Sequence, residues 1–116
     1  MAITLVTNNV AERGFVANGN SSDLSGCETL VAAVTGKSIY IEKIAVSFGA
    51  AINVTIGEGE SSDGVDTVLV GPIYGAANSS IEMEYTRPIK VTAATALTAD
   101  ASGAGNVTVV VQGYIE

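Results

Sequence analysis

The stretch NVTVVVQGYIE, residues 106–116, decides the fold class. Its apolar side chains alternate with polar ones, with Val107, Val109, Val111 and Ile115 in one set and Asn106, Thr108 and Gln112 in the other. A period of two predicts a strand that has one buried face and one solvated face. We therefore expect the C-terminus to be held in a sheet and the chain to be an all-β unit.

Comparable strands are expected at short intervals from residue 28 onward, at 29–34, 38–48, 51–56, 65–70, 80–85, 89–92 and 95–98. The apolar phase switches within 38–48, which predicts a β-bulge near Glu42 and Lys43. Gly71-Pro72 is expected to end one strand, and Pro88 to open another. Short strands separated by Gly-rich turns predict a jelly-roll-like β-sandwich of about eight antiparallel strands.

The core of this sandwich must be built from aliphatic side chains, because Trp is absent and aromatic residues make up only 5% of the chain. The alternation assigns to it Leu30, Ile44, Val46, Ile52, Val54, Ile56, Leu69, Ile81, Met83, Ile89, Val91, Leu97, Val107, Val109 and Val111.

The first 27 residues differ from the rest, since they place a few apolar residues in a background of Asn, Gly and Ser. Ile3 and Leu5 indicate one short strand, and Asn18-Gly19 is a turn signal. Two alternatives remain open, an extended arm and a loose opening hairpin. We divide the chain into an N-terminal arm, 1–27, and a β-sandwich domain, 28–116. The arm is expected to dock on a partner through Ile3, Leu5, Phe15 and Val16.

The composition predicts contact with other protein. Hydrophobic residues make up 47% of the 116 residues and charged residues only 15%, so apolar surface is left over for a partner to cover. Tyr40, Val110 and Tyr114 oppose the main apolar set of their strands, which makes them candidates for a subunit interface. No apolar run approaches the roughly 18 residues that span a bilayer, so no membrane partner is expected.

The charged residues argue against several functions. Twelve acids against five scattered bases give a net charge of −7, and nucleic-acid binding needs clustered bases. His is absent and Cys27 is the single cysteine, so we expect no catalytic residues, no cofactor, no metal site and no enzyme activity. The acidic segment 57–66 leaves cation binding open. The residues after Met1 do not resemble a signal peptide, which predicts synthesis in a cytoplasm.

Several segments resemble small bacteriophage and prophage virion proteins: IYIEKIAVS at 39–47, NVTIG at 53–57, VGPIY at 70–74, RPIKV at 87–91 and TALTADASGAGNVTV at 95–109. The resemblance covers about two thirds of the chain and its motifs are moderately specific. It implies a jelly roll, a homotrimer, and a capsid decoration or cement protein on the virion surface. The partners would be further copies of the chain and the lattice of the major capsid protein in a bacterial host. The arm residues Ile3, Leu5, Phe15 and Val16 would then dock on this capsid.

A glycan-binding module of a phage tail or surface is the alternative, because jelly rolls also serve as lectins. Exposed aromatic side chains would carry the sugars. The candidates for such a platform are Tyr40, Tyr74, Tyr85 and Tyr114.

Overall fold

Nine β-strands make up the ordered elements of the computed structural model, which describes residues 4–8, 14–23, 27–61 and 64–116. The strands are β1 Thr4–Asn8, β2 Gly14–Asp23, β3 Glu28–Val31, β4 Ile39–Phe48, β5 Asn53–Ser61, β6 Gly64–Tyr74, β7 Ser79–Lys90, β8 Leu97–Ala101 and β9 Ala104–Ile115. Over the described ranges, no helix is long and apolar enough to cross a membrane.

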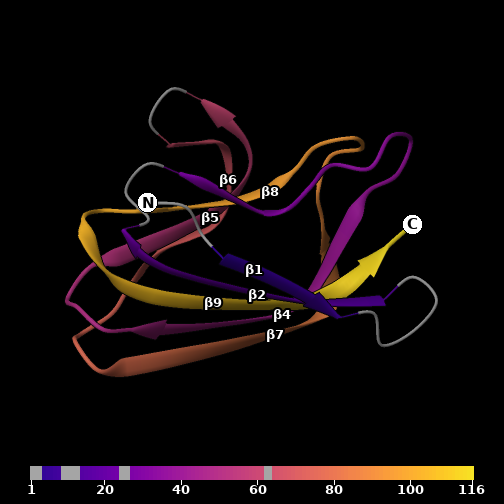
Figure 1. Cartoon of the computed structure of the whole chain (residues 1–116). Helices are drawn as coiled ribbons and strands as arrows, with labels where there is room; N and C mark the ends of the chain where they lie inside the picture. The colour runs from indigo at the N-terminus through magenta and orange to yellow at the C-terminus, as the bar shows by residue number, and fades with distance from the viewer. Residues whose placement is uncertain (1–3, 9–13, 24–26, 62–63) are drawn as a thin grey trace.

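The eight strands from β2 through β9 pair in a nested order, in which the first strand pairs with the last and each following pair lies inside the one before. β2 pairs with β9, β3 with β8, β4 with β7 and β5 with β6, all of them antiparallel. One sheet has the order β1-β2-β9-β4-β7 and the other β3-β8-β5-β6, and Figure 1 shows the two layers facing each other. A chain wound as one long hairpin into two sheets is a jelly roll, which confirms the predicted fold class.

The core lies between the two sheets and is almost entirely aliphatic. Every residue that the alternation assigned inward is either buried in it or packed against it. Ile52, Leu69, Ile81, Met83 and Ile89 are the half-buried members. The prediction omitted several buried residues, among them Phe15, Ile39, Ile41 and Phe48. The alternation therefore identified core residues in strands of both sheets.

The predicted bulge in β4 is confirmed. The register of β4 shifts between Ile41 and Lys43 against both of its neighbours, β7 and β9. The shift keeps Ile41 and Ile44 on the core side, and both are fully buried. An extra residue in one strand permits this, because it restores the inward phase after a break in the alternation.

Segment 14–23, which the sequence suggested was part of an arm, is a strand of the sandwich. Asn18-Gly19 is not a turn, because these two residues lie in the middle of β2 and pair with Val110 and Val109 of β9. β1 pairs antiparallel with β2, so of the two alternatives the hairpin is correct for these residues. Turn propensity is a local preference, and here the ladder with β9 overrides it.

The two prolines also lie inside strands, where breaks were expected. β6 continues past Gly71-Pro72, and the strand expected at 80–85 continues across Pro88 to Lys90 in the single strand β7. Residues 91 and 92, which were expected in a strand, follow the end of β7. Both strands are at the edge of their sheets. Pro has no N–H to donate, and an edge strand can turn that position away from its only neighbour.

Candidate interaction surface

The outer face of the five-stranded sheet brings together the residues predicted to form a subunit interface. In β9 the side chains alternate between the core and this face, so Thr108, Val110, Gln112 and Tyr114 point away from the core. In the register, Tyr40 lies opposite Tyr114, and Ala45 opposite Val110. Tyr40, Val110 and Tyr114 thus share one face of the molecule, each of them half-buried.

An aromatic row crosses this face near the end of β9. The rings of Tyr40 and Tyr114 are stacked, with their centroids 4.8 Å apart and an angle of 12° between their planes. Lys90 Nζ lies 6.0 Å from the centroid of the Tyr40 ring, at the outer limit of a cation–π contact. The three residues occupy one register row across β7, β4 and β9, so cross-strand pairing itself brings the rings together.

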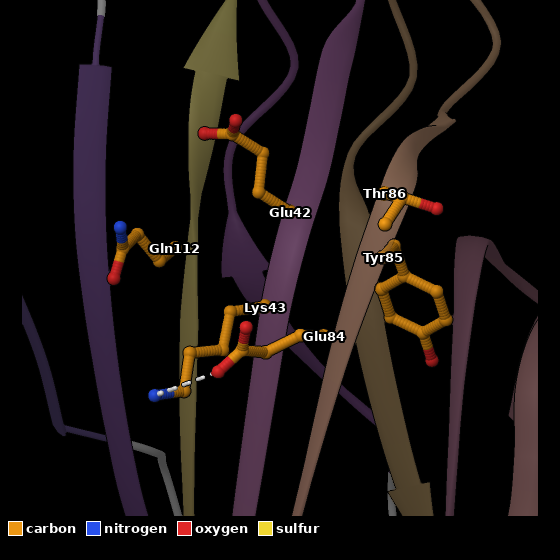
Figure 2. Close-up of a pocket in the computed structure, with 6 residues that line it drawn as sticks. All are labelled: Glu42, Lys43, Glu84, Tyr85, Thr86 and Gln112. Atoms are coloured by element: carbon orange, nitrogen blue, oxygen red, sulfur yellow. Dashed lines mark ion pairs between the residues drawn. The ribbon is translucent and has the colours of Figure 1, made fainter.

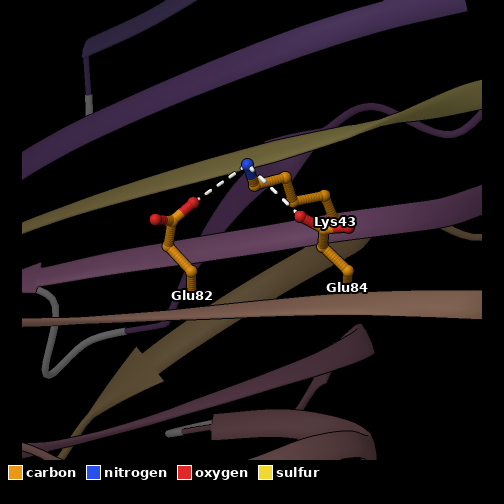
Figure 3. A network of polar contacts seen from close by, with 3 residues as sticks. All are labelled: Lys43, Glu82 and Glu84. Atoms are coloured by element: carbon orange, nitrogen blue, oxygen red, sulfur yellow. Dashed lines mark ion pairs between the residues drawn. The ribbon is translucent and has the colours of Figure 1, made fainter.

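Lys43 is the centre of an exposed ion-pair network, shown in Figure 3. Its Nζ lies 2.9 Å from Glu82 Oε1 and 3.8 Å from Glu84 Oε1. The hydrogen bond to Glu82 and the attraction of its charge raise the pKa of Lys43. All three side chains are in contact with solvent, so the network contributes little to stability. The network does show that charged groups on this face lie on β4 and β7.

A depression of about 420 Å³ opens where β7 bulges away from β4. Ile41 pairs with Ile89 and Lys43 with Glu84, so residues 85–88 stand opposite Glu42 alone. Figure 2 shows its lining, which is Glu42, Lys43, Glu84, Tyr85, Thr86 and Gln112. A second depression of about 230 Å³ is lined by Lys43, Ala45, Glu82, Val110 and Gln112. Lys43 and Gln112 border both, so the face is uneven around them.

The other sheet covers part of its own outer side. In β8 not only the inward Leu97 and Ala99 are buried but also Thr98, which is 1% exposed. The Thr98 hydroxyl donates a hydrogen bond of 2.7 Å to the Gly59 carbonyl oxygen in β5. Cys27 is buried beside it, and burial raises the pKa of its thiol from 9.0 to about 11. The thiol is therefore protonated at neutral pH.

Of the acidic segment 57–66, residues 57–61 form the end of β5 and residues 64–66 the start of β6. The Glu58 carboxylate accepts hydrogen bonds from the backbone N–H of Thr92 and from its hydroxyl, the latter at 2.8 Å. This carboxylate therefore fixes the loop before β8. In the ranges that the structure describes, no three His, Cys, Asp or Glu residues lie together as metal ligands.

The residues predicted to dock on a capsid are not equivalent. Phe15 is 2% exposed and belongs to the core, so its assignment as a docking residue was wrong. It faces the core because β2 completes the sheet beside β9. Val16 points to the outer face and is half-buried. Leu5 belongs to β1, whereas Ile3 lies outside the described residues, and for both the docking role stays a prediction.

The four tyrosines do not form a common platform. Tyr40 and Tyr114 stack on the outer face of the five-stranded sheet. Tyr85 packs against the core, and burial raises the pKa of its hydroxyl. Tyr74 is 73% exposed on β6, in the other sheet. The fold thus places the four tyrosines at three separate locations, although the sequence alone allowed them to form one platform.

Comparison with known proteins finds no matching family model and no curated protein of similar sequence. Among solved structures, the chain is similar to the capsid asymmetric unit of cyanophage Pam1, with 14% identity, a TM-score of 0.48, and coverage of 96% of this chain and 92% of the other. It is also similar to a cupin domain from Bordetella pertussis Tohama I, with 8% identity, a TM-score of 0.42, and coverage of 99% and 94%.

A third similarity is to the virus-like particle of the extra small virus of the giant freshwater prawn Macrobrachium rosenbergii. The identity is 14%, the TM-score 0.40, and the coverage 99% of this chain and 80% of the other. The assignment of this chain as a jelly roll rests on its own strand order.

Proposed function

We propose that this chain is a non-enzymatic structural protein of a phage virion, and more specifically a capsid decoration protein that binds and stabilises the head. The observation that carries the proposal is the nested jelly-roll pairing of β2 to β9, an architecture used in viral capsids, lectins and cupins. The virion-like segments described above favour the first of these uses. The protein would be made in the cytoplasm of a bacterial host and function on the capsid surface.

A non-enzymatic role is supported by the state of the reactive groups. Cys27 is buried with a raised pKa, which makes it a poor nucleophile, because the thiolate is the reactive form. Glu82 and Glu84 face Lys43 on an exposed sheet, where little removes solvent from either carboxylate. A general acid needs such desolvation to hold its proton near neutral pH.

Two kinds of partner belong to the proposal. One is the lattice of the major capsid protein, and the other is further copies of the chain, with a homotrimer as the number that the resemblance implies. Nucleic acid and membranes are not proposed as partners, because the chain carries a net charge of −7 and its five bases are scattered.

The test is binding to particles. The full chain is mixed with particles induced from the strain that encodes it, and the mixture is sedimented. We expect the chain to pellet with the particles at a fixed number of copies for each capsid subunit, and to raise the temperature at which the heads release DNA. Absence from the pellet under conditions in which the particles stay intact would contradict the proposal.

Glycan binding is the alternative function, and an array of glycans tests it directly. The separation of Tyr74 and Tyr85 from the Tyr40–Tyr114 pair argues against a broad sugar platform. Reproducible binding of one glycan class that is lost on Tyr114→Ala, in a variant that stays folded, would favour the lectin.

A further inference from the structure

The two sheets carry very different charges. The strands of the four-stranded sheet hold five carboxylates and no Lys or Arg: Glu28, Glu58, Glu60, Asp66 and Asp100. The strands of the five-stranded sheet hold four acids and three bases, namely Asp23, Glu42, Glu82 and Glu84 against Lys43, Arg87 and Lys90. Most of the negative charge therefore lies away from the five-stranded sheet.

Charge is also unevenly distributed within the five-stranded sheet. β4 and β7 carry the ion-pair network and Lys90, whereas β9 has no charged residue from Ala104 to Ile115. β2 is uncharged from Gly14 until Asp23 at its end. The outward residues of β2 and β9 therefore form an uncharged strip, which we define as Val16, Thr108, Val110, Gln112 and Tyr114. Lys43 of β4 lies opposite Gln112 and lines one depression with Val110. Its ion pairs with Glu82 and Glu84 therefore form the border of the strip, together with the other charged residues of β7.

This arrangement has the anatomy of a protein interface. A stable interface has a centre depleted in charge and a polar rim, and burial of an unpaired charge is strongly unfavourable. The strip supplies an uncharged centre with Val110 and the Tyr114 ring, and β7 supplies the rim. The four-stranded sheet does expose Val68 and Tyr74 on its edge strand β6. Its strands carry five carboxylates and no base, however, so two copies that met through this sheet would bring like charges together.

We infer that a second copy of this chain covers the uncharged strip, and that the acidic four-stranded sheet stays exposed in the assembly. Two molecules that each carry a charge of −7 repel each other over most orientations. They approach at least cost through the surface that carries no charge. A basic partner would instead be drawn to the four-stranded sheet. The inference rests on the homo-oligomer of the proposed function, and it assigns the surface through which that oligomer forms.

The test compares one substitution in two places on the full chain. Val110→Glu puts a carboxylate in the strip, and Val68→Glu puts the same group on β6 of the four-stranded sheet, where Val68 is 55% exposed. Light scattering at micromolar concentration gives the mass of each variant. We expect the wild type and Val68→Glu to be oligomers. Val110→Glu should dissociate toward the 11.7 kDa of one chain, with a dissociation constant raised by about tenfold or more.

Other outcomes are informative and can be told apart. A monomeric wild type would overturn both the inference and the proposed oligomer, while particle binding would still be judged by sedimentation. An oligomer that survives Val110→Glu, or that only Val68→Glu dissociates, would overturn the inference and leave the oligomer intact. If Val110→Glu fails to fold by circular dichroism, Gln112→Glu takes its place, because Gln112 is exposed and the change preserves its shape. Unchanged mass for this variant would count against the strip.

Discussion

The five-stranded and the four-stranded sheet contribute to one core, yet their outer faces are built in opposite ways. β9 alternates strictly, so that half of its side chains point away from the core. β8 is buried on both sides at Thr98, where the β5 carbonyl groups accept its hydrogen bond. The four-stranded sheet thus covers part of its own outer side, and its strands carry five carboxylates and no base. The five-stranded sheet leaves an uncharged strip open, which is why a partner is expected there.

The largest effects on stability are expected from core substitutions, and they should be similar in the two sheets. Ile44 on β4 and Ile56 on β5 are both fully buried, so Ile44→Ala and Ile56→Ala should each lower the free energy of unfolding by about 2–5 kcal/mol. Urea denaturation measures this, and Val68→Ala is the exposed control, which should change it by less than about 0.5 kcal/mol. A loss confined to one sheet would indicate that the sheets do not share a single core.

The next largest loss of stability is expected at two glycines that lie close to the backbone of a neighbouring strand, one in each sheet. A Cβ on Gly113 would overlap the Tyr40 carbonyl oxygen, and a Cβ on Gly57 would overlap the Thr67 carbonyl oxygen. Gly113→Ala and Gly57→Ala should therefore each destabilise the fold by about 1–3 kcal/mol, because backbone must move.

Gly103→Ala is the matched control for both substitutions. A Cβ there would meet only Ile52 Cγ2, at 3.9 Å, so thermal unfolding should be nearly unchanged. A Gly113→Ala variant as stable as this control would show that β9 can shift away from the β4 bulge without loss of packing.

Alkaline pH should distinguish the surroundings of two weak acids, the buried Cys27 just before β3 and the half-buried Tyr85 on β7. The pKa of Cys27 is about 11 in the fold and 9.0 as a free group, so the unfolded state releases its proton first. The stabilisation is complete below about pH 9 and is lost as the pH rises toward 11. Tyr85 has a pKa raised above 10.0 by burial and acts in the same direction at higher pH.

Unfolding midpoints between pH 8 and 11 for wild type, Cys27→Ala and Tyr85→Phe measure the two contributions. Cys27→Ala should flatten the lower part of this dependence, and Tyr85→Phe only the upper part. The same slope in all three proteins would argue against burial of these groups.

The smallest effect is expected at the ion-pair network. Lys43→Met removes the contacts to Glu82 and Glu84, but all three groups are exposed. Stability should hardly change in physiological salt. The thermal midpoint should fall slightly at low ionic strength, where screening is weakest. A large loss of stability would mean that Lys43 has a structural role beyond the pair.

Much of the sandwich was predictable from local patterns, because strict alternation leaves few ways to bury one face. The alternation of Val107, Val109 and Val111 identified β9, and the phase switch at Glu42 and Lys43 identified the bulge. The errors arose where local propensity and sheet position disagree. Asn18-Gly19 suggested a turn, although its pairing with β9 makes it strand. Pro88 suggested a strand start, although an edge strand accommodates it.

The candidate surface was only partly predictable. Tyr40, Val110 and Tyr114 were selected because they oppose the apolar set of their strands, and the register places them on one face. Nothing local indicated that Phe15 belongs to the core, since its burial depends on β2 lying beside β9. The depression near Tyr85 was equally hidden, because it results from unequal numbers of residues in two paired strands.

By itself the sequence determined the class of the fold, the aliphatic core, the shortage of bases and the absence of His, because these follow from composition and from the period of two along each strand. The tertiary structure alone decided which strands are neighbours. That choice separated the acidic sheet from the nearly balanced one and aligned the uncharged strip of β2 and β9. Hydrogen bonds between strands distant in sequence set this order, and no local window contains both partners.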